Sequence, residues 1–127
     1  MPNTVINSTN APAPIGPYSQ AVLANGVLYV SGQIALDPAS GQLVQENIQT
    51  ETHQVMKNLQ AILQEAGLSF DQVVKCTIFV KDLNNFAAIN DVYGSYFGQN
   101  SPARETVEVS RLPKDVNVEI SCIAVVA

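Results

Sequence analysis

Two charged residues near the C-terminal end of the chain stand in apolar surroundings that make a charge costly. Arg104 opens a predicted strand from Glu105 to Val109, and Glu119 lies within V-N-V-E-I-S-C-I-A-V-V, the most apolar strand pattern in the sequence. A carboxylate there must lie at a sheet edge, be paired, or take part in chemistry. Two interpretations follow: a structural ion pair between Arg104 and Glu119, or a site that uses both groups.

Three further polar positions could face such a site. Tyr18 follows a loop, Ser8 to Pro17, whose prolines and glycine give it a set shape, so its ring either projects into a cleft or packs. Ser31 and Gly32 interrupt a strand pattern, where a glycine often marks a bulge or a close approach by a ligand. Asn90 shares an apolar helix stripe, where a buried amide either meets a structural need or faces a site.

These residue types suit a small anionic ligand. Arginine grips a carboxylate with two parallel hydrogen bonds, and a glutamate can activate a water molecule. The sequence has no glycine-rich phosphate loop, no Cys/His metal spacing and no G-x-S-x-G turn, and its sole histidine, His53, is expected to be solvated or partly packed. We therefore predict no metal site and no cofactor.

Composition limits the other classes. Charged residues make up only 13% of the 127 residues, against an average of about 25%, so a self-associating oligomer is expected. The net charge of −5 argues against nucleic acid as a partner. Cys76 and Cys122 lie in apolar strand patterns and are predicted to be buried free thiols. No signal peptide or apolar run of ~20 residues is present, which predicts a cytoplasmic protein with no membrane partner.

The residues are positioned by a predicted single domain spanning 1–127. The pattern predicts strand, strand, strand, helix, strand, helix, strand, strand, which is an α+β sandwich with both helices on one face of a mixed sheet. Asn25-Gly26 predicts a hairpin turn, and Asn47 and Gly67 are the expected helix boundaries. The predicted strands are Thr4 to Ile6, Gln20 to Ala24, Val27 to Ile34, Val73 to Lys81, Glu105 to Val109 and Val116 to Val126, and the predicted helices are Asn47 to Ala66 and Asn84 to Phe97.

Several motifs together resemble one known family over nearly the whole chain. They include A-P-A-P-I-G-P-Y-S-Q at 11–20, L-Y-V-S-G-Q-I at 28–34, P-A-R at 102–104 and V-N-V-E-I-S-C-I-A-V at 116–125. The sequence is similar to the Rid family, also called the YjgF or L-PSP group, which contains 2-iminobutanoate/2-iminopropanoate deaminases. The resemblance implies a chorismate-mutase-like fold and a homotrimer whose sheets form a central barrel, with three clefts between neighbouring subunits.

The resemblance also implies roles for individual residues. Arg104 would hold the carboxylate of a small 2-imino or 2-keto acid, and Glu119 would orient and activate the attacking water. The cleft would be lined by Tyr18, Ser31, Gly32, Asn90 and Thr106. Thr106 stands where close relatives often have cysteine, which favours a role for the backbone there. Two alternatives remain: a metabolite-binding or chaperone-like trimer without turnover, and an RNA-cleaving translation inhibitor.

Overall fold

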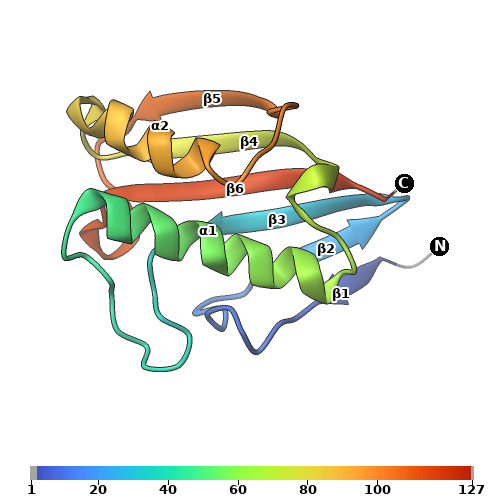
Figure 1. The fold of residues 1–127 in the computed structure, drawn as a ribbon. Coiled ribbons are helices and arrows are strands. Elements are labelled where there is room, and N and C mark those ends of the chain that lie inside the picture. The colour runs from blue at the N-terminus through green and yellow to red at the C-terminus, as the bar shows by residue number, and fades with distance from the viewer. Residues whose placement is uncertain (1–2, 127) are drawn as a thin grey trace.

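The computed structural model describes residues 3–126, and within them six strands form one mixed sheet with two helices against it (Figure 1). This is the α+β architecture expected from the sequence. The elements are β1 (Thr4–Ile6), β2 (Ala21–Ala24), β3 (Val27–Gln33), α1 (Ile48–Glu65), β4 (Val73–Val80), α2 (Phe86–Gly94), β5 (Ala103–Glu108) and β6 (Val118–Val125). Three short 3₁₀ turns, η1 (Phe70–Gln72), η2 (Leu83–Asn85) and η3 (Pro113–Asp115), connect them.

The last strand of the chain lies in the interior of the sheet. The strand order is β1-β2-β3-β6-β4-β5, and every neighbouring pair is antiparallel except β4 and β5. Strands β3 and β4 therefore run parallel to each other, joined through α1 and separated by β6. Glu119 thus sits on an interior strand, while β5, which carries Arg104, forms one edge of the sheet.

Local sequence signals explain why the elements begin and end where they do. The side chain of Asn47 accepts a hydrogen bond from the backbone N–H of Thr50 at 2.8 Å, which caps α1. Gly67, with a φ of 77°, follows the end of this helix. Asn25 and Gly26 have φ values of 52° and 77°, as a two-residue hairpin with a type I′ turn requires.

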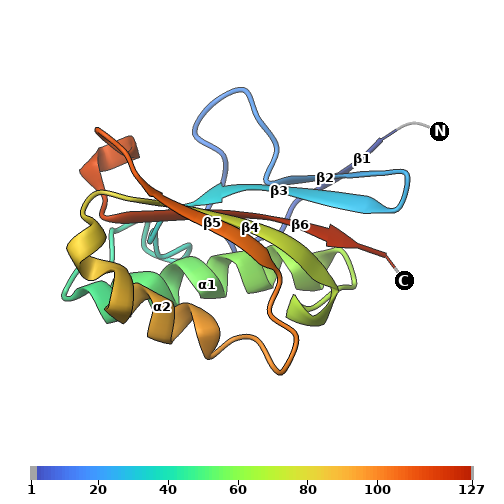
Figure 2. The ribbon, with the colours of Figure 1, turned by 90° about the horizontal axis from the view of Figure 1, so that it is seen from above.

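Both helices cover the same face of the sheet (Figure 2). The opposite face, called the open face below, carries no α-helix, and the loop between β1 and β2 rises over part of it. The apolar side of α1 packs on residues of β3, β4 and β6 that point toward it. Cys76 and Cys122 lie opposite each other in β4 and β6 and are free and buried, as predicted. No helix within residues 3–126 is long and apolar enough to cross a membrane.

Three sequence predictions need correction. The second helix ends at Gly94 rather than Phe97, because Gly94 favours helix poorly and the backbone then continues with shorter-range bonds. Alternation along the predicted strand Val73 to Lys81 places Val74 on the same face as Cys76. A register shift between β4 and β6 at Val73 to Lys75 turns Val74 outward instead, where it is 47% exposed. Strand β6 begins at Val118 rather than Val116, because Val116 caps η3 and Asn117 forms a bend.

Candidate active site

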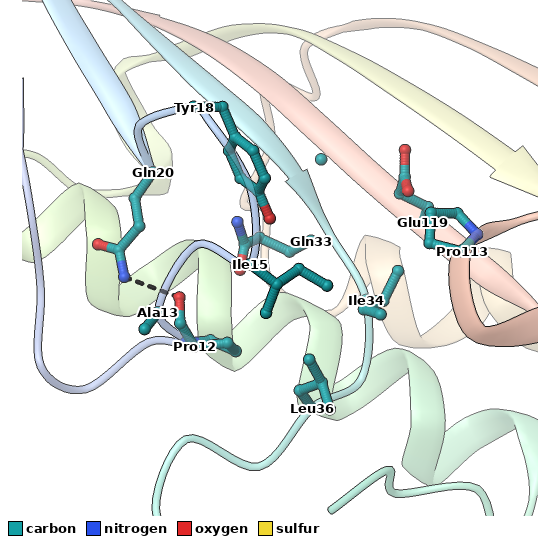
Figure 3. A pocket seen from close by; sticks show the side chains of 11 residues that line it. Pro12, Ala13, Ile15, Tyr18, Gln20, Gln33, Ile34, Leu36, Pro113 and Glu119 are labelled. Atoms are coloured by element: carbon teal, nitrogen blue, oxygen red, sulfur yellow. Dashed lines mark hydrogen bonds between the residues drawn. The ribbon is translucent and has the colours of Figure 1, made fainter. Parts of the chain in front are cut away.

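A small hollow lies where β3 ends and β6 begins, and it contains Glu119 (Figure 3). Its volume is about 80 Å³, which is enough for several water molecules or a small acid. Its walls come from the loop before β2, the end of β3 and the segment after it, η3, and β6. The lining residues are Pro12, Ala13, Ile15, Tyr18, Gln20, Gly32, Gln33, Ile34, Leu36, Pro113 and Glu119.

Gly32 makes room for the carboxylate. The pairing of β3 with β6 shifts register between Val30 and Gln33, so the bulge predicted at this glycine is present. A Cβ atom at position 32 would lie only 2.6 Å from Oε2 of Glu119. The close approach at this position is therefore made by the side chain of Glu119, and any larger residue would displace it.

The sequence allowed two structural explanations for Glu119, an edge position in the sheet or a partner for its charge, and the structure shows neither. Glu119 lies on an interior strand, and no ion pair or side-chain hydrogen bond within residues 3–126 involves it. Its side chain is partly buried, and this burial raises the pKa of Glu119 above its ordinary value of 4.5. A carboxylate with a raised pKa that lines a hollow is a candidate general base.

Tyr18 and Ser31 have different positions relative to the hollow. Tyr18 lines it and is 50% exposed. Ser31 does not line it: its Oγ donates to the carbonyl of Ser19 at 2.6 Å, and its backbone N–H donates to the carbonyl of Gln20 at 2.9 Å. Through these two hydrogen bonds, Ser31 anchors the loop that contains Tyr18 on strand β3.

Arg104 belongs to a second patch, between β5 and α2. Its Nη1 donates to Oδ1 of Asn90 at 2.5 Å, and its guanidinium carbon lies 5.1 Å from the ring centroid of Tyr93 and 5.5 Å from that of Phe86. No carboxylate pairs with it within the described residues 3–126. Asn90 thus faces the candidate arginine, which is one of the two roles predicted for it.

Thr106 lies beside this patch. Its Oγ1 is buried without a hydrogen-bond partner among residues 3–126, and the residue lines a narrow crevice with Asn90 and Arg104. The structure therefore places Arg104, Asn90 and Thr106 together, and separately places Tyr18, Gly32 and Glu119 together.

Strand register explains why the two patches are separate. Arg104 pairs with Cys76, and Glu119 pairs with Phe79, across the same strand β4. Cys76 and Phe79 are an odd number of residues apart, so their side chains point to opposite faces. Arg104 therefore lies on the helix-covered face and Glu119 on the open face. The structure therefore contradicts the first interpretation of the sequence, a structural ion pair between Arg104 and Glu119 within one chain.

The apolar walls of the hollow, and the two buried amides that hold them, were not predicted from the sequence. Gln20 and Asn58 are 2% and 1% exposed, and each makes several hydrogen bonds to backbone carbonyls of the walls. A signal was available for Asn58, which is an amide among the apolar positions of the predicted helix. No comparable signal marks Gln20 at a strand end.

Comparison with known proteins identifies the family of this chain. Residues 8–126 match the family model described as endoribonuclease L-PSP. The chain is 50% identical over 121 residues to the 2-iminobutanoate/2-iminopropanoate deaminase of Capra hircus. This match covers 95% of the present chain and 88% of the goat protein. The chain belongs to the L-PSP family, which is also known as the YjgF or Rid family.

Solved structures show the same fold. The Yersinia pestis protein YyfA, described as a Rid family protein of unknown function, is 52% identical with a TM-score of 0.96, over 98% of this chain and 100% of that one. E. coli TdcF, solved with bound serine, is 40% identical with a TM-score of 0.93, over 98% and 99% of the two chains. The names within the family thus range from deaminase to endoribonuclease to unknown function.

Proposed function

We propose that this protein hydrolyses reactive 2-imino acids to 2-keto acids and ammonia. Its substrates are 2-iminopropanoate and 2-iminobutanoate, with their enamine tautomers such as 2-aminoacrylate, which PLP-dependent dehydratases release from serine and threonine. The observation that carries the proposal is Glu119, a partly buried carboxylate that has no side-chain partner among residues 3–126 and lies in a hollow of about 80 Å³. The goat relative's name supports the same reaction.

The reaction needs a positioned water and a group that moves protons. The oxygen of water forms a bond to the imine carbon while the π electrons of the C=N bond go to nitrogen. Glu119 takes one proton from the water and gives it to the nitrogen, which leaves a hydroxyl and an amino group on the same carbon. Glu119 then takes the hydroxyl proton and passes it to the amino group. The electrons of the oxygen form the C=O bond as the carbon–nitrogen bond breaks, and the electron pair of that bond leaves with ammonia. The raised pKa of Glu119 suits these proton transfers, because it lies closer to neutral pH than that of an exposed carboxyl.

Arg104 supplies the carboxylate clamp from a second copy of the chain. Within one chain the guanidinium and Glu119 face opposite sides of the sheet, so a substrate that meets both must lie between two copies. The open face of the sheet favours such contact, since it exposes Val5, Tyr29 and Val107 at 62%, 51% and 41%. We propose a homotrimer in which three such clefts form, each also lined by Tyr18, Gly32, Asn90 and Thr106.

RNA is a poor match for these clefts. The chain has a net charge of −5, and Arg104 is the one cation lining either the Glu119 hollow or the Arg104 patch within the described residues. Phosphate contacts from several Lys and Arg side chains dominate affinity for nucleic acids. A single guanidinium instead fits one substrate carboxylate.

The test couples a serine or threonine dehydratase to this protein and follows keto-acid release while semicarbazide competes for the imine. The protein should accelerate release, and Glu119→Gln should lose about 10²–10⁴ of the rate while still binding a keto acid in calorimetry. The proposal is wrong if the wild-type protein leaves the rate at that of spontaneous hydrolysis, and metabolite binding without turnover would then stand in its place.

A further inference from the structure

The hollow around Glu119 is more apolar than imine hydrolysis requires. Its only titratable side chains are Glu119 and Tyr18. Six of its lining residues are apolar and lie along two walls and one end (Figure 3): Pro12, Ala13, Ile15, Ile34, Leu36 and Pro113. 2-Iminopropanoate, the smaller of the two proposed imine substrates, carries only a methyl group besides the carboxylate on its reacting carbon. This methyl group leaves most of the apolar surface without a ligand contact.

The apolar surface continues away from the carboxylate. A second hollow of about 290 Å³ shares four residues with the first, namely Pro12, Ala13, Ile15 and Leu36, and ends at Asp37, Pro38, Gly41 and Lys114. All four shared residues are apolar. The two hollows therefore form one groove, which starts at Glu119 and passes between Ile15 and Leu36.

A buried amide holds each wall of the groove in place. Nε2 of Gln20 donates to the carbonyls of Ser8 and Pro12 at 3.1 and 2.9 Å, and its Oε1 accepts from the N–H of Ser8 at 2.6 Å. On the other side, Nδ2 of Asn58 donates to the carbonyls of Ile34 and Leu36 at 3.0 and 2.9 Å. Because both amides are almost fully buried, these bonds are protected from water, and the groove is formed before a ligand binds.

We propose that this groove binds the aliphatic side chain of the substrate, and that Ile15 and Leu36 determine specificity for its length. The inference rests on the proposed function and names its substrate class: 2-imino acids whose side chains have about two to four carbons, straight or branched. A rigid apolar groove rewards each methylene that enters it. It disfavours side chains that end in a charge, because the shared walls offer that charge no polar partner.

The experiment compares a series of substrates that differ only in chain length. An amino-acid oxidase with catalase produces the imines of alanine, 2-aminobutanoate, norvaline and leucine, and semicarbazide trapping reports their hydrolysis. For the wild-type protein, kcat/KM should rise about fourfold for each methylene buried. Ile15 is 68% exposed, so Ile15→Ala should fold normally. It should flatten the series, so that the ratio of kcat/KM for the longest chain to kcat/KM for the alanine-derived imine falls about tenfold.

Val74→Ala is the matched control, since Val74 is 47% exposed and lines neither hollow, and it should keep the wild-type series. Two outcomes would contradict the proposed role of the groove: a kcat/KM that does not depend on chain length, or a dependence that is unchanged in Ile15→Ala. Either outcome leaves the proposed function intact. If the wild-type protein hydrolyses none of the imines, the proposed function fails. Calorimetry with pyruvate, 2-oxobutanoate and 2-oxopentanoate then decides the groove: affinities that rise with length in wild type but not in Ile15→Ala support it, and flat affinities overturn it.

Discussion

If the proposed homotrimer forms, two inactive variants of this protein should restore each other's activity within mixed trimers. If each substrate lies between Glu119 of one copy and Arg104 of the next, Glu119→Gln and Arg104→Ala each damage every site. Loss of the charge-assisted bonds of Arg104 should cost about 10- to 150-fold, and loss of Glu119 about 10²–10⁴. In a mixed trimer, an intact cleft forms wherever an Arg104→Ala chain supplies Glu119 and a Glu119→Gln chain supplies Arg104.

The expected recovery follows from random assembly. In an equal mixture, each of the two required chains occupies its place with a chance of one half, so about one quarter of the clefts are intact. The variants are co-refolded, native mass spectrometry confirms mixed trimers, and imine turnover is measured. Wild type co-refolded with the double variant is the second arm: sites between copies give about one quarter of full activity, and sites within one chain give about one half. Mixed trimers that remain at the level of the single variants would refute the shared cleft.

Four further predictions concern Glu119, Gly32, Asn90 and Thr106. Because burial raises the pKa of Glu119, the folded state binds this proton more tightly than the unfolded state, so its contribution to the free energy of unfolding is lost as pH rises through the raised pKa. Glu119→Gln should remove that dependence in melting curves and also remove the loss of kcat at acid pH. Gly32→Ala should push the carboxylate aside and cost about 10² in kcat without unfolding the protein, because the Cβ would lie 2.6 Å from Oε2. Asn90→Ala removes the hydrogen bond that orients Arg104, so it should raise KM about tenfold. The affinity for a keto acid, measured by calorimetry, should fall by a similar factor. Thr106→Val should keep turnover within about threefold and raise the melting temperature, because the buried hydroxyl has no partner within residues 3–126 and such a group costs about 1–3 kcal/mol.

Signals that act over a few residues were readable from the sequence. Asn25-Gly26 favours positive φ and predicts the hairpin, while Asn47 and Gly67 bracket the first helix within about one residue of its observed ends. Gly32 within a strand pattern predicts the bulge that is present. Each of these follows from the conformational preference of one or two residues, so tertiary context changes little.

The relation between Arg104 and Glu119 could not be predicted in the same way. Alternation shows which residues of one strand share a face, but not how the faces of two strands correspond, because long-range packing sets the register. Here β6 enters between β3 and β4, and the pairing through β4 sends the two side chains to opposite faces. Ser31 shows the same limit on a smaller scale, since its type fits a cleft but its hydroxyl is bonded to Ser19.

The separation of Arg104 from Glu119 has a chemical consequence for the proposed reaction. A guanidinium in contact with Glu119 would favour the ionised carboxylate and lower its pKa, which would weaken it as a base and leave the arginine occupied. The fold avoids this by placing the arginine against Asn90, Phe86 and Tyr93, three groups that orient it without neutralising its charge. Glu119 meanwhile keeps a pKa that burial raises. In the proposed trimer, the substrate's own carboxylate would pair with Arg104. The clamp would then engage only the ligand, and Glu119 would keep its affinity for the proton that it takes from water in the proposed reaction.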